Sequence, residues 1–149
     1  MEIKELGHIV LYVRNLDKSV NFYEKVLGWK RIPVPGGMPA AAFSSGRTHH
    51  ELLLIEVGDF AQPMPKGLRV GLYHFGLKVG DSDDELRDAL KVLQENGIEL
   101  EGATDHTVTH SLYIEDPDGN EIELYVDVPG VDWKTDPHLF ASRPKYLEL

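Results

Sequence analysis

The chain contains the same pattern twice, and this internal repeat restricts its possible folds more than any other feature. Residues 8–13, HIVLYV, return as residues 74–79, HFGLKV, at an offset of 66. Residues 51–54, ELLL, return as residues 121–124, EIEL, at an offset of 70. Because the matches keep their order and nearly their spacing, we expect two copies of one structural unit in tandem.

Each copy is predicted to form a strand, a helix and three further strands. In the first copy, a β-branched and aromatic run predicts a strand over residues 7–13. Asn15 is placed to cap the helix that follows, and Gly28 stands where a left-handed C-terminal cap is expected. The predicted apolar stripe of this helix is Leu16, Val20, Tyr23 and Leu27. Three later strands are predicted over residues 29–33, 40–44 and 49–57.

The second copy repeats this order, beginning with a strand over residues 72–79. Its helix opens with a capping box, Ser82 and Glu85, and closes at Gly97, which matches the capping glycine of the first copy at an offset of 69. Residues 116–119, DPDG, predict a hairpin turn. The predicted apolar stripe of this helix is Leu86, Ala89, Leu90 and Leu93. Three later strands are predicted over residues 99–102, 108–115 and 121–126.

The sequence therefore predicts an α+β fold of two tandem βαβββ modules in a single domain over residues 1–149. We expect module one at about residues 5–58 and module two at about residues 71–127, with a linker between them. The remaining tail, residues 128–149, contains three aromatic side chains, so we expect it to dock, either as a lid over a cavity or on a second subunit. The tail residues behind this expectation are Pro129, Trp133, Pro137, Phe140, Pro144 and Tyr146.

Composition removes several classes of function. Without cysteine, the chain forms no disulfide, thiolate nucleophile or sulfur-based metal site, so any metal must be held by imidazole and carboxylate groups. A formal net charge of −10 and scattered basic residues do not fit a nucleic-acid partner. No run approaches the roughly 18 apolar residues of a membrane span, and no secretory signal opens the chain, so we expect a cytoplasmic protein with no membrane partner.

Two histidines occupy equivalent places in the repeat. If the copies are related by an approximate twofold axis, His8 and His74 face one another at the start of their strands. Glu123 lies on the last strand of the second copy, on the face opposite Ile122 and Leu124. Two imidazoles and one carboxylate form a facial triad with open positions, a set suited to non-haem Fe(II). Taken alone, a histidine at the start of a strand is more often a structural residue than a ligand, and Glu123 is as often a solvated strand residue. The coincidence of His8 and His74 under the repeat is what favours a metal site.

The chain resembles the vicinal oxygen chelate superfamily over about residues 6–127. The resemblance rests on the opening segment, residues 8–28, which contains L-x-x-S-x-x-F-Y-x-x-V-L-G, and on the closing segment, residues 116–124, DPDGNEIEL. Within that superfamily, residues 47–52, RTHHEL, and residues 105–113, DHTVTHSLY, are similar to short extradiol catechol dioxygenases. The resemblance implies the two-module fold and a homodimer, since short members usually pair.

The resemblance also implies roles for individual residues. His8, His74 and Glu123 match the iron ligands of the extradiol enzymes. Tyr113 matches a tyrosine that contacts the bound catecholate, and His106 matches a histidine near the substrate hydroxyl. These residue types suit the chemistry, because a catechol must lose protons to chelate iron and a phenol can hold and protonate a substrate oxygen.

One of two adjacent histidines, His49 or His50, matches the acid–base histidine beside the O₂ position. An imidazole with a pKa near 6.5 can both accept and return a proton at neutral pH. Strand parity with Leu53 favours His49, although the motif leaves His50 open. His110, on the opposite strand face, and His138, in the tail, are assigned no role.

The implied reaction is extradiol ring cleavage of a catechol-type aromatic by O₂, catalysed by a non-haem Fe(II) oxidoreductase of aromatic catabolism. The expected partners are therefore a small aromatic diol and O₂. Fe(II) is expected from the resemblance alone, because Mn(II), Ni(II) or Zn(II) fit similar ligands. The ring substituents, proximal or distal cleavage, and the use of one chain or two for each site stay open.

Two other classes of function remain as alternatives. The first alternative is a glyoxalase-type lyase or isomerase. In that family design, four residues bind the metal, including a glutamate on the fourth strand of each module. In the first module that place falls to Leu53, while Glu51 lies two residues away and Glu56 has the wrong parity. A metal-free binding protein like the bleomycin-sequestering members would lack the ligand set. Metal-dependent fosfomycin-modifying transferases share the three-ligand pattern, so the triad alone does not fix the reaction.

Overall fold

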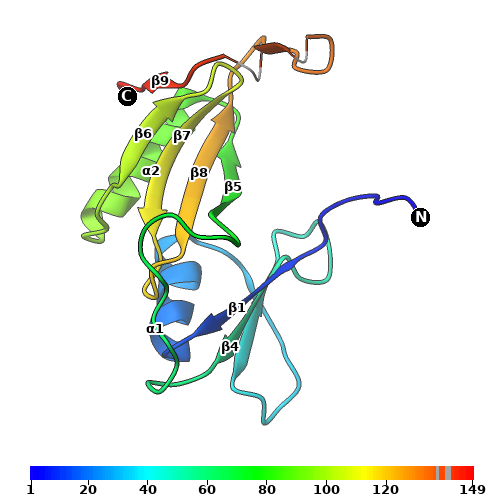
Figure 1. Cartoon of the computed structure of the whole chain (residues 1–149), viewed down its shortest axis with the longest axis vertical. Coiled ribbons are helices and arrows are strands. Elements are labelled where there is room, and N and C mark those ends of the chain that lie inside the picture. Colours follow the sequence, from blue (N-terminus) through cyan, green and yellow to red (C-terminus); the bar gives the residue numbers. More distant parts are fainter. Residues whose placement is uncertain (137, 140–141) are drawn as a thin grey trace. The chain divides into compact units, whose positions relative to one another are not determined.

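The computed structural model describes residues 1–136, 138–139 and 142–149, which form two compact units, Met1–Met64 and Pro65–Leu149 (Figure 1). Among the described residues, each unit opens with a strand, a helical segment and three further strands that form one mixed sheet, to which β9 adds a fifth strand in the second unit. The predicted α+β class and the tandem βαβββ modules are therefore confirmed. Among the described residues, no helix combines the length and the apolar character that crossing a bilayer requires.

The first unit has a four-stranded sheet in the order β1-β4-β3-β2. Strand β1 runs parallel to β4, and the other neighbours are antiparallel. The helical segment packs on β3 and β4 and buries one face of the sheet. The elements are β1 (Ile9–Val13), α1 (Leu16–Val20), the π-helix η1 (Asn21–Val26), β2 (Arg31–Ile32), β3 (Ala40–Phe43) and β4 (Leu52–Glu56).

The helix of the first unit begins and ends as the sequence predicts. The Lys18 N–H donates to the side-chain oxygen of Asn15 at 2.9 Å, which satisfies one of the free donors of the first turn. Gly28 follows with a φ of 68°, the left-handed conformation that glycine adopts without strain.

Between its ends the helix turns differently from the prediction. After α1 it widens into η1, where the Leu27 N–H donates to the Phe22 carbonyl at 3.0 Å. Of the predicted stripe, Tyr23 is buried, whereas Leu16, Val20 and Leu27 are half-buried. The buried side chains are Ser19, Phe22, Tyr23 and Val26.

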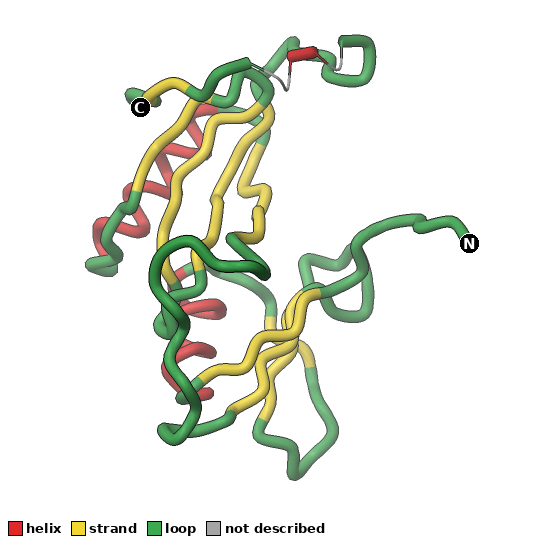
Figure 2. The backbone as a smooth tube through the Cα atoms, viewed as in Figure 1, coloured by secondary structure: helices red, strands yellow, loops and turns green. Residues whose placement is uncertain are grey.

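The second unit has a five-stranded sheet in the order β5-β8-β7-β6-β9, with β5 parallel to β8. Figure 2 shows α2 as the long helix along one face of this sheet, where it packs on β5, β7 and β8. Leu86 and Leu93 of α2 are buried against the strands, as predicted. The elements are β5 (His74–Gly80), α2 (Asp83–Glu95), β6 (Gly102–Asp105), β7 (Thr109–Glu115), β8 (Glu121–Asp127) and β9 (Lys145–Tyr146).

The end of the tail docks on the second sheet, a place that neither predicted alternative specified. Strand β9 pairs antiparallel with β6, and Leu147 is buried beside it. Trp133 and Tyr146 stay largely exposed. Two tail residues used in the prediction, Pro137 and Phe140, lie outside the described residues.

The repeat is visible in the register of the parallel strand pairs. Val10 of β1 pairs with Leu53 of β4, and the equivalent Gly76 of β5 pairs with Glu123 of β8. Equal register therefore places Leu53 in the first unit where Glu123 stands in the second, as the sequence offset predicts. The first unit has no carboxylate at the place where the second has one.

Candidate metal centre

The second unit brings together two of the three predicted metal ligands. His74 opens β5, and Glu123 lies on the neighbouring strand β8 on the same face of the sheet, because register and period-2 alternation give them equal parity. Their facing atoms, His74 Nε2 and Glu123 Oε2, are 3.4 Å apart. Two ligands that each lie about 2.1 Å from one ion are about 3.0–3.4 Å apart at octahedral to tetrahedral angles. The spacing fits donors to a shared metal.

The two oxygens of the Glu123 carboxylate have different surroundings. Ser111 Oγ donates to Oε1 at 2.6 Å, and the Tyr113 hydroxyl donates to the same oxygen at 3.1 Å. Oε2 is the oxygen that faces His74. Because protein donors hold Oε1, the carboxylate is fixed in an orientation that leaves Oε2 for a cation. The residues present therefore fit a divalent metal ligated by one carboxylate oxygen and the His74 imidazole.

His106 and Tyr113, both predicted near the substrate, are in direct contact. His106 Nε2 lies 2.7 Å from the Tyr113 hydroxyl oxygen. Because the phenol proton is donated to Glu123, the phenol oxygen accepts from His106 Nε2–H. Burial, followed by the negative charge of Glu123, raises the pKa of Tyr113. The phenol therefore stays protonated at neutral pH and can donate a hydrogen bond.

A strained turn lies directly beside His106. Thr107 has a φ of 73°, a left-handed conformation that β-branched residues rarely adopt. The turn is held by the Thr107 N–H, which donates to Asp105 Oδ1 at 2.6 Å, and by the His106 N–H, which donates to the Thr109 carbonyl at 2.9 Å. The hairpin thus fixes the backbone from which the His106 ring reaches Tyr113.

The first unit gathers the other three predicted site histidines. The ring centroid of His8 is 4.4 Å from that of His50 and 6.4 Å from that of His49. The strand predicted to start at residue 49 begins at Leu52 as β4, so His49 and His50 lie in the preceding loop and strand parity does not distinguish them. Burial, together with the charges of His8 and His49, lowers the pKa of His50.

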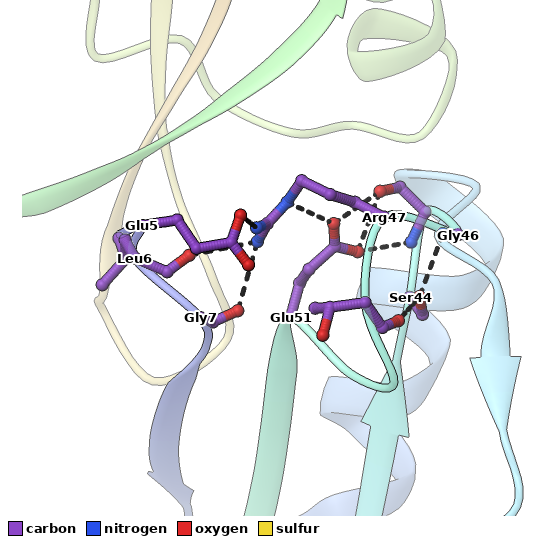
Figure 3. A network of polar contacts seen from close by, with 9 residues as sticks. Glu5, Leu6, Gly7, Ser44, Gly46, Arg47 and Glu51 are labelled. Carbon is purple, nitrogen blue, oxygen red and sulfur yellow. Dashed lines mark hydrogen bonds and ion pairs between the residues drawn. The ribbon is translucent and has the colours of Figure 1, made fainter. Parts of the chain in front are cut away.

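Arg47 connects the loop that contains His49 and His50 to the backbone before His8 (Figure 3). Its Nη2 donates to the carbonyls of Leu6 and Gly7, at 3.2 and 3.1 Å. Its Nε donates to Glu51 Oε1 at 3.1 Å. One planar guanidinium therefore ties the residues before β1 to the residues before β4.

Glu51, considered above as a fourth ligand, is already engaged. The Ser45 N–H donates to its Oε2 at 2.5 Å, and the Ser45 hydroxyl and Arg47 bind the same carboxylate. Burial raises its pKa, but the hydrogen bonds from Ser45 and Arg47 outweigh burial and lower the pKa of Glu51 overall. Leu53, at the position equivalent to Glu123, cannot bind a metal, and Glu51 is already bound by Ser45 and Arg47.

We expect Arg47→Ala to lower the free energy of unfolding by about 1–2 kcal/mol, because several charge-assisted hydrogen bonds disappear together. Urea unfolding of the variant measures this loss. Arg87→Ala is the matched control, since Arg87 pairs with the exposed Asp84 within α2 and its loss should cost at most about 0.5 kcal/mol. Equal losses for the two variants would contradict the bridging role.

Two further residues of the second unit surround the His74–Glu123 pair and were given no role from the sequence. Glu121 Oε1 lies 3.3 Å from His74 Nδ1, and Ser111 is fully buried beneath Glu123. The charge of Glu121 and burial raise the pKa of the neighbouring Tyr73 hydroxyl. Period-2 spacing from Glu123 and Tyr113 is the signal that could have placed both Glu121 and Ser111 on the site face.

Within each unit, the described residues contain no group of three or more histidine, aspartate or glutamate side chains arranged to hold a metal ion. The second unit supplies the pair His74 and Glu123, and the third predicted ligand, His8, belongs to the first unit. His110 Nδ1 contacts Asp83 Oδ1 at 2.6 Å on the helix-covered side of the sheet, in keeping with its having no assigned role. His138 is exposed.

Curated relatives include enzymes that act on catechols. The chain is 36% identical over 135 residues to a catechol-2,3-dioxygenase of Bacillus subtilis, covering 91% of this chain and 46% of that protein. It is 34% identical to a biphenyl-2,3-diol 1,2-dioxygenase of Rhodococcus globerulus, covering 82% and 63% of the two chains. The chain thus spans about half to two thirds of the length of these relatives.

Other similar proteins match this chain over most of their own length. The chain is 30% identical to a lactoylglutathione lyase of Neisseria meningitidis, covering 85% of this chain and 94% of that protein. A glyoxalase/dioxygenase from Nostoc punctiforme has the same fold, with a TM-score of 0.69 at 22% identity over 83% and 91% of the chains. The family profile described as Glyoxalase/Bleomycin resistance protein/Dioxygenase superfamily matches residues 5–124. The chain belongs to this superfamily, whose members include many enzymes.

Proposed function

We propose that the chain is a metal-dependent extradiol dioxygenase that opens the ring of a catechol-type substrate with O₂. The observation that carries this proposal is the Glu123 carboxylate, whose Oε2 faces His74 Nε2 at 3.4 Å while Oε1 accepts from Ser111 and Tyr113. The similarity to a catechol-2,3-dioxygenase supports the choice of substrate class. Both residues of the pair lie on the open sheet face, away from α2.

The metal would be held by His74 and Glu123 together with His8, if the two modules close as a single domain within one chain or between two copies. Two imidazoles and one carboxylate suit Fe(II), and Mn(II), Ni(II) or Zn(II) are the other candidates. Bound Fe(II) would supply the electron exchange between the diol and O₂ and hold both reactants close together. We further propose a homodimer that acts in the cytoplasm in aromatic catabolism.

The side chains of the second unit have defined tasks in this reaction. Tyr113 has a protonated phenol beside the ligand pair; its one O–H donates to Glu123 Oε1, and turning that O–H away from Glu123 would let it hold and protonate a substrate oxygen, with Ser111 still bound to Oε1. His106, 2.7 Å from the phenol oxygen, fixes the orientation of that hydroxyl and can exchange its proton. Ser111 holds Glu123 from beneath and stays outside the reaction.

His50 rather than His49 is proposed as the acid–base residue, because its ring is the nearer one to His8. We expect His50→Ala to lower kcat by about 10²–10⁴-fold, the range of general acid–base catalysis. His49→Ala serves as the matched variant and should lower kcat by less than about 10-fold. Steady-state oxygen uptake with a catechol measures both, and the opposite order of effects would assign the role to His49.

A glyoxalase-type reaction is the second candidate, favoured by the lactoylglutathione lyase that the chain matches along most of its length. The four-ligand metal site of glyoxalase-type enzymes needs a second carboxylate at the metal. Leu53 occupies the equivalent position, and Glu51 is bound by Arg47 and Ser45. Formation of lactoylglutathione by protein loaded with Ni(II) or Zn(II) would favour this candidate.

The proposed function is tested by metal analysis and oxygen uptake. Protein purified without chelator is analysed for iron, loaded anaerobically with Fe(II), and mixed with a panel of catechols. We expect iron, oxygen consumption and a coloured ring-fission product with at least one catechol. Full catechol binding without any metal would instead indicate a sequestering protein. Absence of turnover with every catechol would contradict the proposed dioxygenase activity.

A further inference from the structure

We propose that Glu121 is a positioning residue that keeps the ring proton of His74 on Nδ1, so that the Nε2 lone pair is directed toward Glu123 Oε2. This inference rests on the proposed metal-dependent function and adds a residue that the sequence motif leaves without a role. It concerns contacts within the second unit only.

Both nitrogens of the His74 ring face carboxylates. His74 pairs with Glu121 in the β5–β8 register, and its Nδ1 lies 3.3 Å from Glu121 Oε1. On the other side of the ring, Nε2 lies 3.4 Å from Glu123 Oε2. A neutral imidazole has one N–H and one lone pair, so its tautomer decides which carboxylate faces a donor.

The state of Nδ1 indicates which tautomer the site requires. Nδ1 is a buried polar atom without a hydrogen bond among the described residues, although Glu121 Oε1 is close by. The distance between Nδ1 and Oε1 allows a hydrogen bond, but the angle at Nδ1–H does not. A small rotation of the ring would therefore complete an Nδ1–H to carboxylate hydrogen bond. A buried N–H with a carboxylate beside it favours the proton at Nδ1, which frees Nε2 for a metal.

The repeat shows that this arrangement is particular to the second unit. Glu51 and Glu121 occupy equivalent positions, 70 residues apart. In the first unit, Arg47 and Ser45 bind Glu51. In the second, Glu121 is paired with His74 and also accepts a hydrogen bond from the Tyr73 hydroxyl. The same position of the repeat thus holds a carboxylate paired with an arginine in the first unit and a carboxylate beside an imidazole in the second.

A carboxylate in this place has a known physical effect on a metal-bound histidine. Histidine ligands usually donate their second ring N–H to a carboxylate, a carbonyl or water, which fixes the ring and makes the ligating nitrogen more basic. Loss of such a partner typically lowers metal affinity by about 10–100-fold. Glu121 is placed to have this effect on His74.

The experiment combines two measurements on Glu121→Ala, Glu121→Gln and the control Glu115→Gln, which removes the same charge from the exposed residue paired with Glu121 on β7. Nitrogen NMR of ¹⁵N-histidine-labelled, metal-free protein reports the tautomer of His74 where its ring is neutral. Anaerobic calorimetric titration with Fe(II) reports the affinity. His74→Ala identifies the NMR signals and gives the affinity without this ligand.

We expect wild type and Glu115→Gln to hold the His74 proton on Nδ1 and to bind Fe(II) equally. Glu121→Ala should shift the proton toward Nε2 and weaken Fe(II) binding by about 10–100-fold. Glu121→Gln should lie between, because an amide oxygen still accepts from Nδ1–H without carrying charge.

An unchanged tautomer in Glu121→Ala would overturn the proposal, as would a loss of Fe(II) binding as complete as in His74→Ala, which would make Glu121 a ligand. Absence of Fe(II) binding by wild type would remove the proposed function, while the tautomer would still decide the role of Glu121.

Discussion

Glu123→Ala is expected to abolish Fe(II) binding and ring cleavage while the protein remains folded. Glu123 is the carboxylate at the ligand pair, and its Oε2 is the oxygen directed at His74 Nε2. Loss of a direct ligand should weaken Fe(II) binding by more than the roughly 10–100-fold typical of residues that only support a ligand. Calorimetric titration with Fe(II) and oxygen uptake with a catechol measure the two effects.

Two further variants separate ligation from packing. Glu123→Gln keeps an acceptor for the buried Ser111 hydroxyl and for Tyr113, so its fold should be less disturbed than that of the alanine variant. It should nevertheless lose Fe(II), because a neutral amide is a much weaker ligand than a carboxylate. Glu115→Gln, on the neighbouring strand, should bind Fe(II) normally. A Glu123→Gln protein with wild-type iron affinity would contradict the assignment of Glu123 as a ligand.

Phe43→Ala is expected to lower the free energy of unfolding by about 3–5 kcal/mol, the largest stability effect in the first unit. Phe43 is fully buried on β3, and its ring centroid lies 5.9 Å from that of Tyr23 and 6.2 Å from that of Trp29. Truncation removes apolar burial and leaves a cavity among these rings. Urea unfolding followed by tryptophan fluorescence reports this core through Trp29.

Phe60→Ala is the control for this variant, because Phe60 is fully exposed and its truncation should change stability by at most about 0.5 kcal/mol. A loss of under about 1 kcal/mol for Phe43→Ala would show that the helix of the first unit does not form its core on β3.

The fold could be predicted because the capping residues and the strand and helix propensities agree with the internal repeat. Turn and cap residues such as Asn15, Gly28 and Ser82 place the helices, and the repeat places the strands in equivalent order. The repeat also predicts the register, since Leu53 and Glu123 stand at equal positions in the two parallel pairs. Agreement between propensity, capping and repeat is what makes such a prediction specific.

Other features of the fold depend on interactions that sequence pattern does not encode. Periodicity of 3.6 residues does not foresee that the helix of the first unit continues from Asn21 to Val26 as the π-helix η1. Strand β9 forms because Lys145 and Tyr146 meet the free edge of β6, a long-range pairing without a local signal.

Within the candidate site, the pair His74 and Glu123 could be predicted, because both positions follow from the repeat and from strand alternation. The choice between His49 and His50 could not, because it depends on a loop shaped by Arg47 and not on strand parity. The ligand roles of His8, His74 and Glu123 stay predictions, and His8 belongs to the other unit.

We propose that His8, His74 and Glu123 bind one metal ion, and a crystal structure of the Fe(II)-loaded protein with anomalous diffraction at the iron edge would show whether they do. We predict one iron peak at about 2.0–2.2 Å from an imidazole nitrogen of each histidine and from a carboxylate oxygen of Glu123. An iron peak bound by other residues, or no peak near His74 and Glu123 in protein shown to contain iron, would contradict the claim.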